Sequence, residues 1–397
     1  MGAYSYLTIA DYPTFTNKNT YFEEVVNLLF QPGEYHVEER PLSDKNKLYW
    51  DDAFENDSGS YRSYTFRQNV AICKKRLEIF GCSMIRIRAE WNAARKTLKD
   101  GYDMSDYNYP IERVSFKRYY NELANVLSNK IINYERQRDT LQNCIIADEL
   151  IMQGLSTASS LYAILSVAHP ASIVEYELSD VIESGWVVND PSTQISHEKV
   201  IVLTEGKTDA KILDEALKFL YPQFQPYYQF MDFEGLKLEG SASALVRTVK
   251  AFASAKVKHP VIAIFDNDTA GIAEFERLPA ILADNITAIK LPDIKLAKKY
   301  PTIGPTGFRK IDINGLACSI ELYLGDDILI SEGEYQPIRW NGFDPKAKKY
   351  QGSLIAKDSI QATFFQKIAL GDKWPMPEME LLLSRIFSAF QLKTSPI

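Results

Sequence analysis

The second half of the chain alternates between short apolar runs and amphipathic stretches. Uninterrupted apolar runs predict strands, and apolar residues that recur every three or four positions predict helices. The strands are predicted at residues 200–203, 228–233, 261–265 and 286–291, and the helices at residues 208–220, 241–252 and 270–282. Apolar strands separated by helices are typical of a parallel sheet covered on both faces. We therefore predict an α/β domain over residues 198–330, with its ligand site at the carboxyl ends of the strands.

The first half of the chain shows mainly helical spacing. One helix is predicted at residues 66–80, because Gly81 is a common helix stop, and others at residues 84–98, 114–134 and 141–167. Residues 1–60 are harder to interpret and contain one alternating stretch at 4–9 and one helical stretch at 21–30. The resulting prediction is a mainly α-helical region over residues 1–190, a polar linker near residues 187–198 and a helical extension over residues 331–397.

The composition supports at least two folded cores and narrows the classes of function. The 397 residues are 46% hydrophobic, and a single core usually stops growing at about 250–300 residues. The net charge of −7 excludes a protein that coats nucleic acid through a broad cationic surface, but it allows a local basic patch. No secretory signal and no apolar run of ~18 residues is present, so we expect a cytoplasmic protein that does not enter a membrane.

The four cysteines fit buried apolar positions better than a zinc site or a disulfide. They show no CxxC pairing, and their spacing does not match that of zinc ligands. A reducing compartment is the default for such a chain.

Acidic residues follow two of the predicted strands. Glu205 and Gly206 follow residues 200–203 after one threonine, Asp209 opens the next helix, and Asp266 and Asp268 follow residues 261–265. The carboxyl ends of parallel strands open on one crevice, where several carboxylates would repel one another unless a cation held them ionised. Oxygen ligands without nearby His or Cys favour Mg²⁺ or Mn²⁺ over zinc.

Each acid also has a purely structural interpretation. Asp209 could cap its helix or complement the helix dipole, and Asp266 and Asp268 could be turn formers. Glu205 has no obvious structural task at the end of a buried strand. Because acids follow both of these buried strands, a functional site is favoured over a purely structural role.

The segment from Glu205 to Thr208 also resembles the end of a phosphate-binding P-loop. The leading glycine of that motif would fall at Ile201, inside the predicted strand, so the backbone cannot wrap a triphosphate. We therefore expect no nucleotide hydrolysis at this site, and any ATPase would be a separate partner protein.

The two acidic motifs resemble the Toprim domain of topoisomerases, primases, maturase ribonucleases and OLD-type nucleases, over about residues 199–325. Asp209 and the segment Ser319-Ile-Glu321 are similar to further ligands of OLD-family nucleases and of small Toprim effectors in phage defence. The resemblance implies a Rossmann-like parallel sheet and one or two divalent ions held by Glu205, Asp209, Asp266, Asp268 and Glu321, with Ser319 as a further candidate. It implies catalytic roles for Glu205, Asp266, Asp268 and, by a looser alignment, Lys357. Glu321 alone could also be an exposed acid of a surface helix.

The opening residues 1–9 (MGAYSYLTI) and residues 75–81 (KRLEIFG) resemble the N-terminal region of HEPN/Toprim-associated proteins. HEPN ribonucleases use an Arg-x4–6-His motif, and none of the four histidines here follows an arginine at that spacing. The resemblance therefore implies a HEPN-like helical region without its own nuclease site, left to dimerise, to sense or to bind a partner.

Basic residues cluster after the last predicted strand, against the single acid Asp293, in a stretch whose prolines and glycines predict a loop. The candidates for contact with a nucleic-acid backbone are Lys207, Lys295, Lys298, Lys299, Arg309 and Lys310. An ordinary solvated lysine surface explains the same pattern. Two further interpretations apply to Arg113, Lys117 and Arg118, which could extend this nucleic-acid-binding surface or form a solvated helix face.

These patterns favour a metal-dependent Toprim endonuclease that acts on DNA or tRNA as an anti-phage effector. The sequence does not distinguish a DNA substrate from an RNA substrate, because a metal site contacts the phosphate, which both share, rather than the sugar. The alternative is a non-catalytic sensor or scaffold that binds an ATPase partner or a phage component. A primase is disfavoured because its zinc-binding cysteines are missing, and a topoisomerase because no strand-passage domain is evident.

Overall fold

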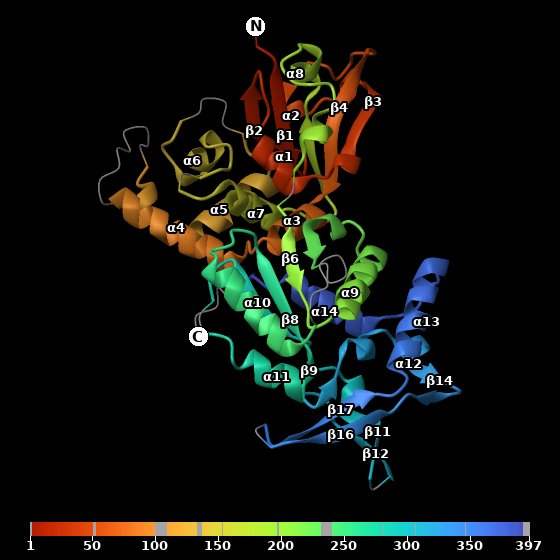
Figure 1. The fold of residues 1–397 in the computed structure, drawn as a ribbon. Coiled ribbons are helices and arrows are strands. Elements are labelled where there is room, and N and C mark those ends of the chain that lie inside the picture. The colour runs from red at the N-terminus through yellow and green to blue at the C-terminus, as the bar shows by residue number, and fades with distance from the viewer. Residues whose placement is uncertain are drawn as a thin grey trace. The chain divides into compact units, whose positions relative to one another are not determined.

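The protein is described by a computed structural model. It covers residues 2–50, 53–99, 109–132, 137–152, 154–196, 198–231, 240–280, 282–305, 307–345 and 347–391. The chain divides into two compact units (Figure 1). Unit 1 lies within Met1–His197 and unit 2 within Glu198–Lys393.

Unit 1 contains a five-stranded antiparallel sheet with the order β2-β1-β5-β4-β3. Val174 and Tyr176 of β5 have no exposed surface, whereas Ile173 is exposed and Glu175 and Glu177 are partly exposed, as expected for a strand with one buried face. The strands are β1 (Tyr4–Ile9), β2 (Tyr12–Lys18), β3 (Tyr35–Pro41), β4 (Ser60–Asn69) and β5 (Ile173–Glu177). The prediction of a mainly helical region over residues 1–190 is therefore incomplete, because unit 1 combines its helices with this sheet.

The helices of unit 1 pack with the sheet around one apolar core. They are α1 (Glu23–Leu29), α2 (Lys47–Trp50), α3 (Val70–Ile79), α4 (Met84–Lys99), α5 (Phe116–Ser128), α6 (Leu141–Ala147), α7 (Thr157–Val167) and α8 (Ser179–Glu183).

Two helix boundaries in unit 1 differ from the prediction for local reasons. The helix expected from residue 66 begins at Val70, because Asn69 caps it by accepting a hydrogen bond from Ile72 N. The helix expected over residues 141–167 is two helices, since Glu149 and Leu150 both have left-handed backbone conformations after α6.

Unit 2 is built on a four-stranded parallel sheet with the order β10-β8-β6-β7. All five residues of β8 are buried. The strands are β6 (Val200–Leu203), β7 (Tyr228–Phe230), β8 (Val261–Phe265) and β10 (Ile286–Lys290), and the intervening helices are α9 (Lys207–Leu220), α10 (Ala242–Ser254) and α11 (Thr269–Phe275). The predicted parallel sheet is confirmed. The prediction for residues 232 and 233 lies outside the described residues.

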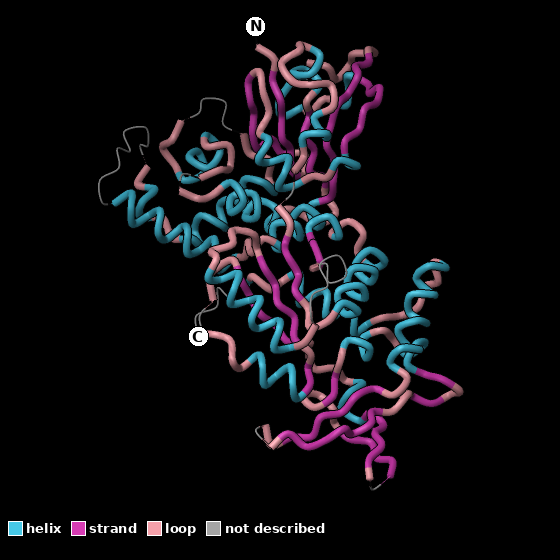
Figure 2. Tube along the Cα trace, viewed as in Figure 1, coloured by secondary structure: helices cyan, strands magenta, loops and turns pink. Residues whose placement is uncertain are grey.

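A second four-stranded sheet in unit 2 has the order β12-β11-β16-β17 (Figure 2). Its strands are β11 (Tyr300–Gly304), β12 (Gly307–Ile311), β16 (Ile338–Asp344) and β17 (Lys349–Leu354). The segment predicted as a loop after β10 therefore includes the β11–β12 hairpin, whose turn contains Pro305 and leads into Gly307 at a φ of 89°.

The remaining elements of unit 2 are short strands and helices. They are β9 (Asn267–Asp268), β13 (Ala317–Cys318), β14 (Ile330–Ser331), β15 (Glu334–Tyr335), α12 (Asp326–Leu329), α13 (Lys357–Leu370) and α14 (Pro377–Phe387). The extension predicted as helical over residues 331–397 is thus strand before Lys357, and residues 392–397 lie outside the described part.

The four cysteines are buried and free, as predicted. No helix in the described ranges has the length and apolarity needed to cross a membrane.

A carboxylate cluster as candidate functional site

Glu205 and Asp266 meet at the carboxyl ends of two adjacent parallel strands. Glu205 follows β6, Asp266 follows β8, and these strands are paired in the sheet. The backbone N–H of Asp266 donates to Glu205 Oε1 at 2.9 Å. The turn after β6 is held by the buried Thr204, whose Oγ1 donates to the carbonyl oxygen of Gly206 at 2.8 Å. Two acids 61 residues apart in sequence are thus in contact at the same edge of the sheet.

Two glycines make room for the Glu205 turn. A Cβ atom at Gly271 would lie 2.5 Å from the carbonyl oxygen of Asp266 and 2.8 Å from Glu205 Oε1. A Cβ atom at Gly240 would lie 2.9 Å from the carbonyl oxygen of Glu205. Real Cβ atoms do not approach this closely, so both positions require glycine.

Glu321 is a fully buried carboxylate in the 3-10 turn η7 (Ile320–Tyr323). Its Oε1 lies 3.1 Å from Lys357 Nζ and accepts a hydrogen bond from Gln361 Nε2 at 2.6 Å. Its Oε2 accepts from Ser319 Oγ at 2.6 Å. The interpretation of Glu321 as an exposed surface acid is therefore wrong, and both residues of the Ser319-Ile-Glu321 motif contribute to one hydrogen-bonded group.

Asp209 lies in the first turn of α9, where a Cβ atom at Gly206 would be 3.3 Å from its Oδ2. Burial raises the pKa of Asp209 to about 6, and the charge of Glu321 adds to this effect, although Lys357 and a hydrogen bond from Gly206 oppose it. The charge of Glu321 therefore acts on Asp209 within the cluster.

Burial and mutual repulsion also raise the pKa values of Glu205 and Asp266. The pKa of Glu205 rises to about 7 mainly through burial, with Asp268 and Asp209 adding to the rise and the Asp266 N–H opposing it. The pKa of Asp266 lies well above its ordinary value because of burial and the charges of Asp209 and Glu205. The carboxylate cluster therefore resists full ionisation unless positive charge is present.

Lys357 brings such a positive charge to the cluster. Burial alone would lower the pKa of Lys357, but its contact with Glu321 and the charges of Asp266 and Asp209 raise it. The residue before it, Ala356, adopts a left-handed conformation with a φ of 58° at the start of α13. Such a backbone is unfavourable for alanine, so the surrounding structure holds Lys357 at this point.

Asp268 has a capping role in the structure. Its Oδ1 accepts from Gly271 N at 2.7 Å as the N-cap of α11, and its Oδ2 accepts from Gln351 Nε2 at 2.6 Å. Asp268 thus has a structural role, as a helix N-cap rather than as the turn former considered from the sequence, while its charge still raises the pKa of Glu205.

The donor atoms of the cluster suit a hard divalent cation, because all are carboxylate oxygens. Within the described ranges, no three Asp, Glu, His or Cys side chains are arranged to coordinate a single ion. In the present arrangement Glu205 accepts from Asp266 N and Glu321 is paired with Lys357. Holding Mg²⁺ or Mn²⁺ would thus require side-chain rotation toward a common point.

The predicted phosphate-binding residues are exposed. Lys207 begins α9 beside Glu205, the three lysines Lys295, Lys298 and Lys299 surround the turn η6 (Leu296–Lys299), and Arg309 and Lys310 lie on β12. Consecutive strand residues point to opposite faces, so Arg309 and Lys310 do not share a face. Lys357, by contrast, contacts an acid of the cluster, Glu321.

The basic residues predicted on the first half lie in unit 1, on or beside α5. Arg113 contacts Glu112 at 3.2 Å, and Lys117 and Arg118 are exposed. These features are those of a solvated surface.

The comparison with protein families matches residues 1–199 to the family described as HEPN/Toprim N-terminal domain 1. The chain belongs to this family. No curated protein and no solved structure matches the chain. The matched HEPN/Toprim N-terminal region ends before Glu205, so it supports a nuclease-related setting and assigns no role to the acids of unit 2.

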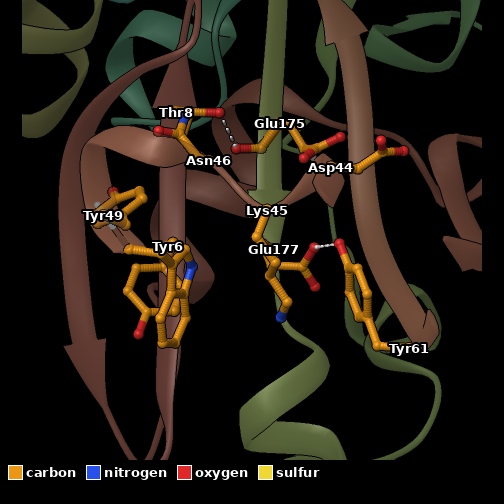
Figure 3. Close-up of a pocket in the computed structure, with 10 residues that line it drawn as sticks. Tyr6, Thr8, Asp44, Lys45, Asn46, Tyr49, Tyr61, Glu175 and Glu177 are labelled. Atoms are coloured by element: carbon orange, nitrogen blue, oxygen red, sulfur yellow. Dashed lines mark hydrogen bonds between the residues drawn. The ribbon is translucent and has the colours of Figure 1, made fainter. Parts of the chain in front are cut away.

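The HEPN/Toprim N-terminal region has a small hollow on its sheet, drawn in Figure 3. Lys45 lies between Tyr6 and Tyr61 there, with its Nζ 3.9 Å from the centre of the Tyr61 ring and 5.4 Å from that of Trp50. About 20 Å³ stays open, room for about one water molecule. The side chains that line this hollow, Lys45 among them, therefore fill most of it.

Sequence reasoning missed the supporting residues of the cluster. Gly240 lies beside the backbone of Glu205, Gln351 donates to Asp268, and Gln361 donates to Glu321. No local sequence pattern predicts these contacts, since glutamines and glycines are common in loops and helices. Gly271 lies in the first turn of the helix that follows Asp266. A glycine at the start of a helix is a sequence signal that could have indicated this close approach.

Proposed function

We propose that unit 2 is a Toprim-type nuclease domain that uses Mg²⁺ or Mn²⁺ to hydrolyse phosphodiester bonds in DNA or tRNA. The contact between Asp266 N and Glu205 Oε1 carries this proposal, because it joins acids from two parallel strands at the edge where such sheets bind ligands. The buried Glu321 and the nearby Asp209 complete a set of hard oxygen donors. The proposal includes an anti-phage role in the cytoplasm, a separate ATPase partner and homodimerisation through the helices of the HEPN/Toprim N-terminal region.

Each residue of the cluster has a distinct task in this proposal. Glu205, Asp209, Asp266 and Glu321 hold the cation, and Asp268 adds charge while it fixes the start of α11. A bound cation would supply an activated water and would neutralise the attacking and leaving oxygens. Lys357, which contacts Glu321, would stabilise the negative charge on the reacting phosphate.

The purified chain tests this proposal when it is incubated with plasmid DNA, single-stranded DNA and total tRNA, with Mg²⁺, with Mn²⁺ or with a chelator. We expect cleavage only with metal, and a loss of about a hundredfold or more in Glu205→Gln and Asp266→Asn. Glu215→Gln is the matched control, because Glu215 lies on α9 and pairs with Lys218. Equal activity of Glu205→Gln and the control would overturn the proposal.

A non-catalytic sensor or scaffold is the second candidate. The ion pair between Lys357 and Glu321 favours it, because the lysine compensates one of the buried acids without metal. Asp266→Ala separates the two functions in a phage-protection assay with the full chain. Protection that survives this substitution supports the scaffold, whereas lost protection by a folded variant supports the nuclease.

A further inference from the structure

One face of the second sheet in unit 2 carries an aromatic side chain and several cations. The pairing register places Phe308 opposite Ile303, Ile303 opposite Arg339, and Arg339 opposite Ser353. Residues that are directly opposite in a sheet point to the same face, so this row crosses all four strands. Phe308 is 71% exposed, and Arg339 and Ser353 are exposed as well.

The side-chain alternation along the strands adds two lysines to this face. Lys310 lies two residues from Phe308 on β12, and Lys349 lies four residues from Ser353 on β17. Both lysines are exposed. Phe308, Lys310, Arg339 and Lys349 together are called the basic sheet face below.

The three cations of the basic sheet face have no carboxylate partner within 4.0 Å among the residues that the structure describes. The acid opposite Lys349 in the register, Asp344, accepts a hydrogen bond from Ala347 N. With Asp344 included, the face carries three cations and one acid, so it is locally positive in a chain with a net charge of −7, as binding of a polyanion requires.

The basic sheet face leads to the carboxylate cluster. Gln351 lies on β17 between Lys349 and Ser353, and its side chain points to the same face. Its Nε2 donates to Asp268 Oδ2 at 2.6 Å, and its Oε1 accepts from Ala270 N at 3.1 Å. Three strand spacings of about 4.8 Å separate β12 from β17, so the face extends about 14 Å away from the acids.

We propose that the basic sheet face binds single-stranded nucleic acid and guides it to the carboxylate cluster. A base stacks on Phe308, and phosphates contact Lys310, Arg339 and Lys349. An exposed ring favours unpaired bases, because a duplex keeps its base faces stacked inside. This inference rests on the proposed nuclease function and adds its substrate class and binding path.

The opposite face of the same sheet supplies a matched control. Phe343 and Tyr350 lie opposite each other there, with ring centres 5.1 Å apart, and Trp340 packs 6.3 Å from Tyr350. Phe343 is 52% exposed, which is comparable to Phe308, but it does not lie on the basic sheet face. Lys258, an exposed lysine just before β8 at the amino ends of the parallel strands, is the control for loss of charge.

The test is fluorescence anisotropy of labelled oligonucleotides with the full chain in a chelator, where binding is measured without cleavage. Single-stranded DNA, single-stranded RNA and duplex DNA are compared over a range of salt concentrations. We expect single strands to bind more tightly than duplex, and Phe308→Ala to weaken binding about tenfold. Lys310→Ala combined with Arg339→Ala should reduce the salt slope by about 1.4, which corresponds to two phosphate contacts on a single strand. Phe343→Ala and Lys258→Ala should bind as the wild type does.

Three results would overturn the binding path: tighter binding of duplex, unchanged binding by the Phe308 and Lys310/Arg339 variants, or an equal loss in Phe343→Ala. A wild-type chain that binds no oligonucleotide overturns it too. A chain that binds through this face but cleaves nothing with metal would retain the binding path and remove the nuclease function. Cleavage that is unaffected in the Phe308 and Lys310/Arg339 variants would retain the nuclease function and remove the binding path.

Discussion

The ammonium of Lys357 lies 3.1 Å from Oε1 of Glu321, a carboxylate with no exposed surface. A buried carboxylate that loses its cation is strongly destabilising, because its desolvation is no longer compensated. Gln361 and Ser319 donate hydrogen bonds to Glu321 but bring no charge. Lys357 therefore supplies the positive charge that offsets the desolvation of Glu321.

Replacement of Lys357 by alanine should lower the thermal unfolding midpoint in chelator. We expect a loss of about 2 kcal/mol, below the value for a fully buried pair, because the Lys357 side chain is 42% exposed. Mg²⁺ should restore more stability to this variant than to the wild type, since the cation replaces the missing charge. Lys218→Ala is the control, because Lys218 pairs with Asp214 and Glu215 on the surface and should cost less than about 1 kcal/mol. A Lys357→Ala protein as stable as the control would contradict this role.

Gly271→Ala should disrupt the cluster without removing any functional group. The added methyl would press on the carbonyl oxygen of Asp266 and on Glu205 Oε1, so the turn after β8 must shift. Overpacking of this kind costs about 1–3 kcal/mol, and the displacement of Glu205 should abolish metal-dependent cleavage. Gly342→Ala has open space around its added Cβ and serves as the control in urea unfolding and cleavage assays. Full activity of Gly271→Ala would show that the close approach is unimportant.

The stability of the metal-free protein should fall as the pH rises from about 4 to about 7. The pKa of Glu205 rises from 4.5 to about 7, and that of Asp209 from 3.8 to about 6. Between the unfolded and folded pKa values the folded chain binds more protons, so the free energy of unfolding decreases with increasing pH. This contribution is complete below pH 4 and is lost above pH 7.

Thermal unfolding across this pH range, with and without Mg²⁺, measures the effect. We expect the stabilisation by Mg²⁺ to be small at pH 5 and larger at pH 8, because the metal binds the ionised carboxylates. The double variant Glu205→Gln and Asp209→Asn should flatten the pH profile and remove most of the metal effect. A metal effect of equal size at both pH values would argue against binding at these acids.

The parallel sheet and the meeting of its acids followed from periodicity, because a buried parallel strand leaves an uninterrupted apolar run such as that of β8. The carboxyl ends of such strands share one edge, so the proximity of Glu205 and Asp266 needed no further information. Asp268 shows the limit of this reasoning. The sequence Asp-Asn-Asp suits both a ligand and a helix cap, and the contact with Gln351, 83 residues away, is what engages its second oxygen.

The sheet of unit 1 was not predicted because its strands are far apart in sequence and weakly patterned. Strand β5 pairs with β1 and β4 across more than a hundred residues, and β3 is exposed along most of its length. Strand β4 runs directly into α3, and the apolar residues of both elements together imitate one long helix from Phe66. Pairing at such distances is set by tertiary contacts rather than by local propensity.

The buried ion pair between Arg76 and Glu34 should be a main determinant of the stability of unit 1. Arg76 has no exposed surface, its two terminal nitrogens contact the two oxygens of Glu34 at 2.6 and 2.7 Å, and one of them also donates to the carbonyl oxygen of Leu29. Glu34→Ala leaves a buried guanidinium without its carboxylate, so we expect a loss of about 3–5 kcal/mol in chemical unfolding of the full chain.

Arg86→Ala, which breaks a partly exposed i,i+4 pair, is the control and should cost about 0.5 kcal/mol. The paired replacement Arg76→Leu and Glu34→Leu should be less harmful than Glu34→Ala alone, because it removes both buried charges at once. A double variant that is less stable than Glu34→Ala would show that the geometry of this pair, rather than its charge balance, holds α3 in place.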